Sequence, residues 1–180
     1  MNTTVNESSK ILENLHVWSH LQTGKVQNNS EKLNVKAIVD NVIQLKELSA
    51  EQKDIYLTVD LEESKFVIAD KNMFELIIRN LISNALKFTQ RGGSISISSK
   101  TNDKYEAITV SDSGIGISDE NMQKLFKIEG DFHTMGTEHE SGTGLGLVLC
   151  SDFAKKMNGT ITVTSKVGEG SSFTVSLPKS

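Results

Sequence analysis

Three polar side chains recur at helical spacing near the middle of the chain. Asn80, Asn84 and Lys87 are separated by four and three residues, which places them on one face of an α-helix. The other side of this segment is apolar, so the helix can bury one stripe and present two amides and an ammonium to a ligand. An amide oxygen suits Mg²⁺, and a lysine suits a phosphate. The alternative is a solvated polar face, although asparagine is not favoured inside helices.

A second group of residues, DSGIGI at 112–117, directly follows a predicted strand. Gly114 and Gly116, one residue apart, let the backbone turn tightly and approach a flat ligand. The Asp112 carboxylate before them can accept a hydrogen bond from an exocyclic amine such as that of adenine. A plain turn between a strand and a helix would contain the same residue types.

A third group is the glycine-rich segment GTGLG at 142–146, which leads straight into a predicted helix. Glycine-rich loops at helix N-termini expose N–H groups to an anion, and the helix dipole adds to the attraction. Phosphate binding is therefore the expected use. The same glycines could also serve as a hinge for the loop before them.

The elements that position these groups follow from the spacing of apolar residues. Asp70 is expected to cap the helix that carries Asn80 and Asn84. Residues 127–142 show no period and are predicted to form a long mobile loop. The fold class is α+β: a two-layer sandwich of one mixed, mostly antiparallel sheet with helices on one face. Predicted helices span 9–22, 35–49, 71–88, 119–126 and 145–157, and predicted strands span 55–59, 66–69, 94–99, 106–111, 160–164 and 172–177.

Composition excludes several classes of protein. A formal net charge of -4 argues against nucleic acid as a partner, because phosphate backbones are bound by a surplus of Lys and Arg. Cys150 is the single cysteine, so neither a disulfide framework nor a zinc knuckle can form, and a cytoplasmic location is expected. No stretch approaches the roughly 18 apolar residues that cross a bilayer. Anchoring of the full-length protein in an inner membrane is expected only through upstream segments.

The order and spacing of these motifs resemble the catalytic domain of sensor histidine kinases. Residues 80–88 (NLISNALKF) look like that family's N box, and residues 124–132 (KLFKIEGDF) look like its F box. The glycine motifs of the family resemble residues 112–117, 142–147 and 168–173. This resemblance covers a domain at 30–180. Residues 1–29, with the predicted helix, resemble a remnant of the second helix of the family's dimerisation and phosphotransfer hairpin.

The resemblance implies an ATP site of the Bergerat type. Asn84 would hold Mg²⁺, Lys87 would meet the phosphates, and Asp112 would recognise adenine, with Asn80, Asn84 and Lys87 as the catalytic set. The remaining residues expected to bind ATP are Phe88, Gly114, Gly116, Ile117, Phe126, Gly142, Thr143, Gly144, Leu145, Gly146 and Thr174.

The chemistry at position 80 distinguishes between activities in the wider superfamily. Hydrolytic members place a glutamate four residues before the Mg²⁺-binding asparagine, where it can activate water. Asn80 cannot take a proton at neutral pH, so a protein histidine kinase is favoured over an ATPase clamp. The alternative is a nucleotide-sensing module without transfer, because residues 128–146 contain no Lys or Arg.

The partners follow from the missing acceptor. None of His16, His20, His133 and His139 has the family's acceptor context, in which glutamate and then proline follow the histidine in a helix. The expected partners are therefore the phosphoacceptor hairpin of the same kinase and a response regulator receiver domain. The full-length protein is expected to be a homodimer, and the isolated chain a monomer or weak dimer.

Overall fold

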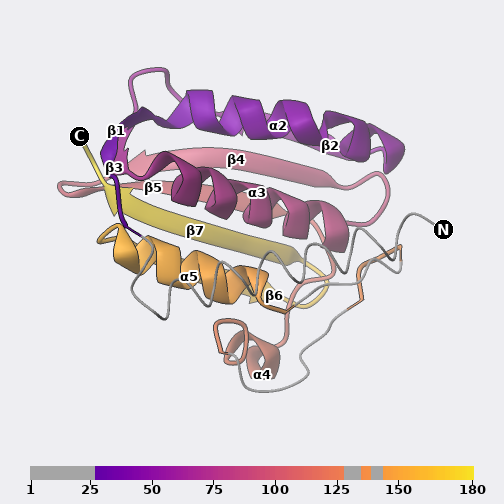
Figure 1. The fold of residues 1–180 in the computed structure, drawn as a ribbon. Coiled ribbons are helices and arrows are strands. Elements are labelled where there is room, and N and C mark those ends of the chain that lie inside the picture. The colour runs from indigo at the N-terminus through magenta and orange to yellow at the C-terminus, as the bar shows by residue number, and fades with distance from the viewer. Residues whose placement is uncertain (1–26, 128–134, 139–143) are drawn as a thin grey trace.

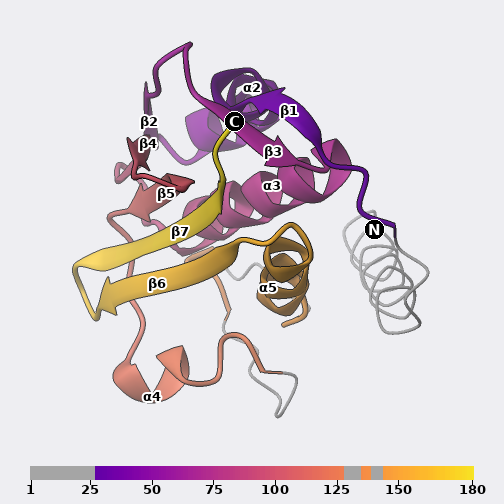
Figure 2. The ribbon, with the colours of Figure 1, turned by 90° about the vertical axis from the view of Figure 1, so that its left-hand side faces the viewer.

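The computed structural model describes residues 27–127, 135–138 and 144–180, which fold as two layers (Figure 1). One layer is a five-stranded sheet in the order β2-β4-β5-β7-β6. Its strands are β2 (Tyr56–Asp60), β4 (Ser94–Thr101), β5 (Tyr105–Asp112), β6 (Thr160–Lys166) and β7 (Gly170–Pro178). β2 runs parallel to β4, and the other neighbours are antiparallel. Figure 2 shows that the other layer lies on one face of this sheet and consists of α2 (Val35–Gln52), α3 (Lys71–Phe88) and α5 (Gly146–Lys156). The predicted fold class is confirmed.

A second, smaller sheet lies beside the main one. It pairs β1 (Glu31–Asn34) with β3 (Phe66–Ala69) in antiparallel register. The strand at 66–69 was predicted, whereas β1 was not, and these two strands form a sheet of their own instead of joining the main one. An isolated bridge between Val67 and Lys179 links the small sheet to the end of the chain.

The helix α3 has the bounds predicted from the sequence. The Asp70 side chain accepts hydrogen bonds from the backbone N–H groups of Asn72 and Met73, which have no partner within the helix. At the other end, the helix stops at Thr89, whose backbone is extended. Eight side chains of α3 are buried. Because this stripe is buried, only the opposite, polar face of α3 is available to contact a ligand.

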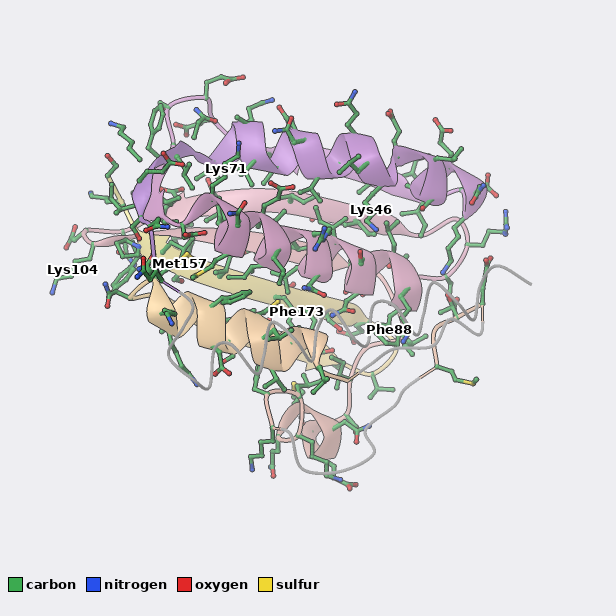
Figure 3. All side chains as sticks on the ribbon, in the orientation of Figure 1. Lys46, Lys71, Phe88, Lys104, Met157 and Phe173 are labelled. Atoms are coloured by element: carbon green, nitrogen blue, oxygen red, sulfur yellow. The ribbon has the colours of Figure 1, made fainter. Side chains whose placement is uncertain are left out.

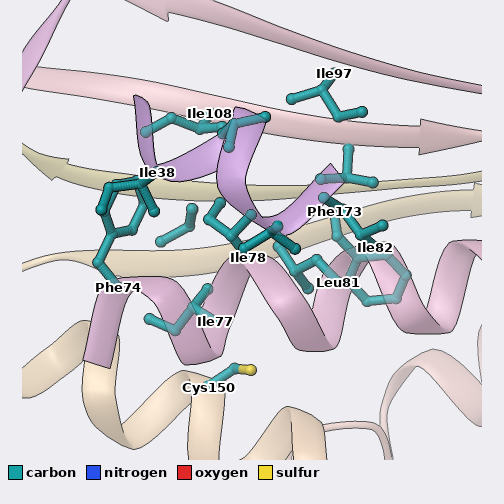
Figure 4. Packing of buried hydrophobic residues seen from close by; sticks show 14 of the residues in the cluster. Ile38, Phe74, Ile77, Ile78, Leu81, Ile82, Ile97, Ile108, Cys150 and Phe173 are labelled. Atoms are coloured by element: carbon teal, nitrogen blue, oxygen red, sulfur yellow. The ribbon is translucent and has the colours of Figure 1, made fainter. Parts of the chain in front are cut away.

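The core lies between the helices and the main sheet. Ile78, Leu81 and Ile82 of α3 face Ile97 and Ile108 of the sheet (Figure 4). Each of these side chains is at most 1% exposed. Burial of one such side chain stabilises a fold by about 1.5–3 kcal/mol. This core therefore holds the middle of α3 firmly against the sheet.

Most predicted elements differ from the structure by a few residues; α2, for example, ends at Gln52 and not at residue 49. α4 (Asp119–Met122) is shorter than the helix expected at 119–126. After it, the chain forms tighter turns with hydrogen bonds between residues three apart, such as Lys127 N to Lys124 O at 3.1 Å. Those turns bury Leu125. α5 begins at Gly146 and ends at Lys156, one residue inside the prediction at each end.

Several expectations fall outside the described residues. They are the helix at 9–22, all four histidines, Gly142 and Thr143, and most of the loop predicted at 127–142, of which residue 127 and residues 135–138 are described. Within the described ranges, no helix combines the length and the apolar character required to span a bilayer.

Candidate functional site

The first glycine loop packs against the carboxyl end of α3. The backbone N–H of Ile115 donates to the Phe88 carbonyl at 3.1 Å. A Cβ added to Gly114 would collide with that carbonyl and would lie 2.7 Å from Oδ1 of Asp112. Only glycine permits this approach. The structure therefore brings Phe88, Asp112 and Gly114 together, and Figure 3 shows Phe88 at the end of α3.

Asp112 is the half-buried carboxylate of this group. Burial raises the pKa of Asp112, and hydrogen bonds from the backbone N–H groups of Gly114 and Ser171 oppose that rise. The bond from Gly114 N to Oδ1 is 2.9 Å long. A Cβ on Gly170 would collide with the Asp112 carbonyl, so the third glycine motif packs against the same residue. The carboxylate is thus oriented by backbone donors on two sides.

The β6–β7 hairpin supports the other side of the loop. Gly116 has φ +69°, which an L side chain rarely adopts, and a Cβ there would collide with the Lys166 carbonyl. The backbone N–H of Ile117 donates to Oγ of Ser165 at 2.8 Å. That hydroxyl in turn donates to the Gly170 carbonyl at 2.8 Å. Ser165 was not predicted, because a serine in a polar strand gives no sequence signal for this role.

Two polar residues of α3 lie near its carboxyl end, where the helix contacts the first glycine loop. Asn84 is half-buried, one turn before Phe88. Nζ of Lys87 lies 4.7 Å from the centre of the Phe88 ring, at cation–π distance. An amide and an ammonium therefore stand on α3 within one turn of the glycine loop.

Asn80 is placed differently from Asn84. Its Nδ2 donates to the Leu76 carbonyl of its own helix at 3.1 Å, and a Cβ on Gly146 would lie 2.9 Å from its Oδ1. Asn80 also hydrogen-bonds the Cys150 thiol, although burial dominates and raises the pKa of Cys150 to about 12. The Asn80 side chain therefore lies in the contact between α3 and α5.

The amino end of α5 follows the second glycine motif directly. Gly144 has φ +67°, and the helix starts two residues later with Leu145 as its N-cap. The first-turn N–H groups of a helix have no partner within it, and an anion can satisfy them. Gly144, Leu145 and Gly146 therefore lie where the chain enters a helix.

Thr174 and Phe126 complete the predicted set. Strand pairing places Ser171 opposite Asp112 and Thr174 opposite Thr109. Residues three apart on a strand point to opposite faces, so Thr174 lies on the face away from Asp112, where its hydroxyl bonds that of Thr109 at 2.9 Å. The structure does not bring Thr174 to the site, and Ser171 occupies that place. Phe126 is half-buried and packs against the core.

The chain has relatives among known proteins. Residues 69–180 match the family described as histidine kinase-, DNA gyrase B-, and HSP90-like ATPase. The sensor-like histidine kinase SenX3 of Mycobacterium tuberculosis is 33% identical over 162 residues, which cover 89% of this chain and 39% of SenX3. The aerobic respiration control sensor protein ArcB of Escherichia coli is 32% identical over 191 residues, covering 95% of this chain and 24% of ArcB. The chain therefore spans well under half the length of either protein.

Solved structures that resemble this chain also include histidine kinases. The histidine kinase AdeS of Acinetobacter baumannii aligns with a TM-score of 0.79 and 25% identity, covering 97% of this chain and 79% of AdeS. The nucleotide-free catalytic domain of the histidine kinase ThkA aligns with a TM-score of 0.72 and 27% identity, covering 84% of this chain and 96% of that domain.

Proposed function

We propose that this chain, the ATP-binding domain of a sensor histidine kinase, transfers the γ-phosphoryl group of ATP to a histidine outside the chain. The premise is that the chain belongs to the family of histidine kinase-, DNA gyrase B-, and HSP90-like ATPases. One observation carries the proposal. The glycine loop at 112–117 is hydrogen-bonded to the carboxyl end of α3, next to Lys87. Adenine and phosphate recognition can therefore take place side by side.

Each part of the nucleotide has a group suited to it. The Asp112 carboxylate accepts a hydrogen bond from the exocyclic amine of adenine, while Gly114 and Gly116 keep the backbone close to the base. Lys87 and the first-turn N–H groups of α5 bind the phosphates. No Lys or Arg occurs at 128–146, so these groups carry most of the protein's share of charge neutralisation.

Magnesium fits this set of residues through Asn84. Mg²⁺ is usually held by one or two protein oxygens together with substrate phosphates and several waters. Among the described residues no group of three His, Cys, Asp or Glu could hold a metal ion. Bound Mg²⁺ would neutralise phosphate charge.

The phosphoryl transfer itself is a displacement at phosphorus. A nitrogen of the acceptor imidazole attacks the γ-phosphorus, a P–N bond forms, and the bond to the bridging oxygen breaks to release ADP. Asn80 supports transfer over hydrolysis, because its amide cannot act as a base toward water and is held between α3 and α5. The acceptor is proposed to lie on a hairpin of the same dimeric kinase, and a response regulator to receive the phosphoryl group next.

A second candidate is a nucleotide-sensing module that binds ATP without transferring phosphate. The absence of Lys and Arg from residues 128–146 favours it, because many related kinases carry a basic residue near the γ-phosphate. Calorimetry with ATP, with and without Mg²⁺, tests the shared part of both proposals, and equal affinities would remove Asn84 from the metal site. Phosphate release by the purified chain tests the rest: rapid turnover without an acceptor would contradict both and favour an ATPase.

A further inference from the structure

The carboxyl end of α3 is held by hydrogen bonds from three separate segments of the chain. The last carbonyls of a helix have no partner within it and must find one elsewhere. Four such carbonyls accept bonds here: Leu86 O from Lys53 Nζ at 2.9 Å, Lys87 O from Thr137 N at 3.0 Å, Phe88 O from Ile115 N at 3.1 Å, and Thr89 O from Thr137 Oγ1 at 3.0 Å.

Thr137 donates to two of these carbonyls, through both its backbone N–H and its hydroxyl. Besides its backbone N–H, its hydroxyl lies 3.2 Å from the Lys87 carbonyl and 3.0 Å from the Thr89 carbonyl. The same hydroxyl accepts a hydrogen bond from Nζ of Lys53 at 2.8 Å. A hydroxyl has one proton to donate and lone pairs to accept with, so the two carbonyls share the proton and Lys53 uses a lone pair. Valine has the same shape and could make none of these side-chain bonds.

Lys53 explains why the threonine hydroxyl is needed. The Lys53 residue is only 7% exposed, and a buried ammonium is costly unless it is hydrogen-bonded. Its acceptors include the Leu86 and Lys87 carbonyls and Oγ1 of Thr137. A positive charge at the carboxyl end of a helix is also favoured by the helix dipole. Removal of the Thr137 hydroxyl takes one acceptor from a buried charge.

The side chains of Met135 and Glu138, close to Thr137 in the chain, are exposed. Glu138 lies 3.5 Å from Arg91, but both side chains are about half exposed, and such surface ion pairs contribute about 0–1 kcal/mol. Met135 is 62% exposed. Among the described residues, the hydrogen bonds that join 135–138 to the end of α3 are those of Thr137.

We propose that Thr137 is a positioning residue for nucleotide binding: its bonds dock residues 135–138 on the end of α3 and fix the backbone of Lys87, so that the Lys87 ammonium is held where the phosphates bind. This role rests on the proposed function, because it acts through the lysine assigned to the phosphates. It connects the segment between α4 and α5 to the phosphate-binding lysine by direct hydrogen bonds.

The test compares Thr137→Val and Thr137→Ser with the wild-type chain. Thr58→Val is the matched control, since the Thr58 hydroxyl only contacts the Ile95 carbonyl, at 3.4 Å. ATP affinity is measured by displacement of a fluorescent ATP analogue. We expect Thr137→Val to weaken ATP about tenfold, which corresponds to about 1.4 kcal/mol, while Thr137→Ser and Thr58→Val stay near wild type.

A double-mutant cycle with Lys87→Met separates positioning from a general structural effect. If Thr137 acts through Lys87, Thr137→Val should cause no further loss of ATP affinity in the Lys87→Met chain. Unchanged affinity in the single variant, or an equal loss in both backgrounds, overturns the proposal.

Amide hydrogen exchange without nucleotide examines the docking separately from ATP binding. Thr137→Val should speed exchange at residue 137 about tenfold and leave β5 unchanged. If exchange at residue 137 does not change, the docking is overturned even where ATP binds. If the wild-type chain fails to bind ATP, the proposed function falls and the positioning role falls with it, whereas the exchange result still decides whether residues 135–138 dock on α3.

Discussion

Replacing Asp112 by asparagine should weaken ATP binding without weakening the fold. The carboxylate already accepts backbone N–H groups from Gly114 and Ser171. An asparagine that turns its single oxygen toward the Gly114 N–H leaves its NH₂ group facing the exocyclic amine of adenine. Two donors then meet. The loss of this hydrogen bond should cost about 1–3 kcal/mol, or about fivefold to 150-fold in Kd.

The stability of this variant should not fall at neutral pH. Burial raises the pKa of Asp112, so the folded chain disfavours the charged carboxylate relative to the unfolded chain. A neutral amide of the same shape avoids that penalty. A loss of ATP affinity with an undiminished urea midpoint would therefore identify a binding role rather than a structural one.

Calorimetry with two nucleotides gives the sharpest form of the experiment. Inosine triphosphate carries a carbonyl oxygen where ATP carries the exocyclic amine, so Asp112→Asn should narrow or reverse the wild-type preference for ATP. Asp103→Asn, an exposed residue in the β4–β5 turn, is the charge-matched control and should behave like wild type. Unchanged ATP affinity and an unchanged ratio between the two nucleotides in Asp112→Asn would refute the assignment of adenine to this carboxylate.

Three further predictions concern the loop, its pH dependence and the helix cap. Gly114→Ala should abolish measurable ATP binding in calorimetry, because its Cβ would collide with the Phe88 carbonyl; wild-type affinity would mean that the loop can move away from α3. Folding raises the pKa of Asp112 above its ordinary value of 3.8, so the unfolding free energy should fall as pH rises from 3.8 through the folded pKa. Urea titrations of Asp112→Asn at the same pH values should not show this decrease. Asp70→Ala should lower the unfolding free energy by about 0.5–2 kcal/mol, since two N–H groups lose their cap; an unchanged urea midpoint would show that Asp70 does not stabilise α3.

Helical spacing and cap chemistry were enough to predict α3 and its cap. The apolar stripe and Asp70 are both local features, so they could be read without knowledge of the fold. The same holds for the glycines at 114 and 116, whose close approaches to Phe88 and Lys166 explain why no side chain is present there. Local sequence therefore indicated the glycine loop and the helix beside it.

Contacts between distant segments were beyond sequence reasoning. Thr174 was predicted to bind ATP, but strand register decides which residue of β7 lies beside Asp112, and the structure pairs Ser171 with Asp112. The packing of Asn80 against Gly146 and Cys150 depends on how α3 and α5 cross. Thr137 and Lys53 are 84 residues apart, and neither belongs to a motif that suggested their hydrogen bond.

The central claim is that this chain keeps ATP intact until a histidine from another segment arrives. Incubation of the chain with labelled ATP and Mg²⁺, with and without a dimerisation hairpin from the same kinase, tests it by intact-mass measurement. The account predicts one acid-labile phosphate on the hairpin histidine, none on the chain, and no transfer when the histidine is replaced by glutamine. A stable phosphohistidine on the isolated chain, or rapid phosphate release with no labelled hairpin, would contradict it.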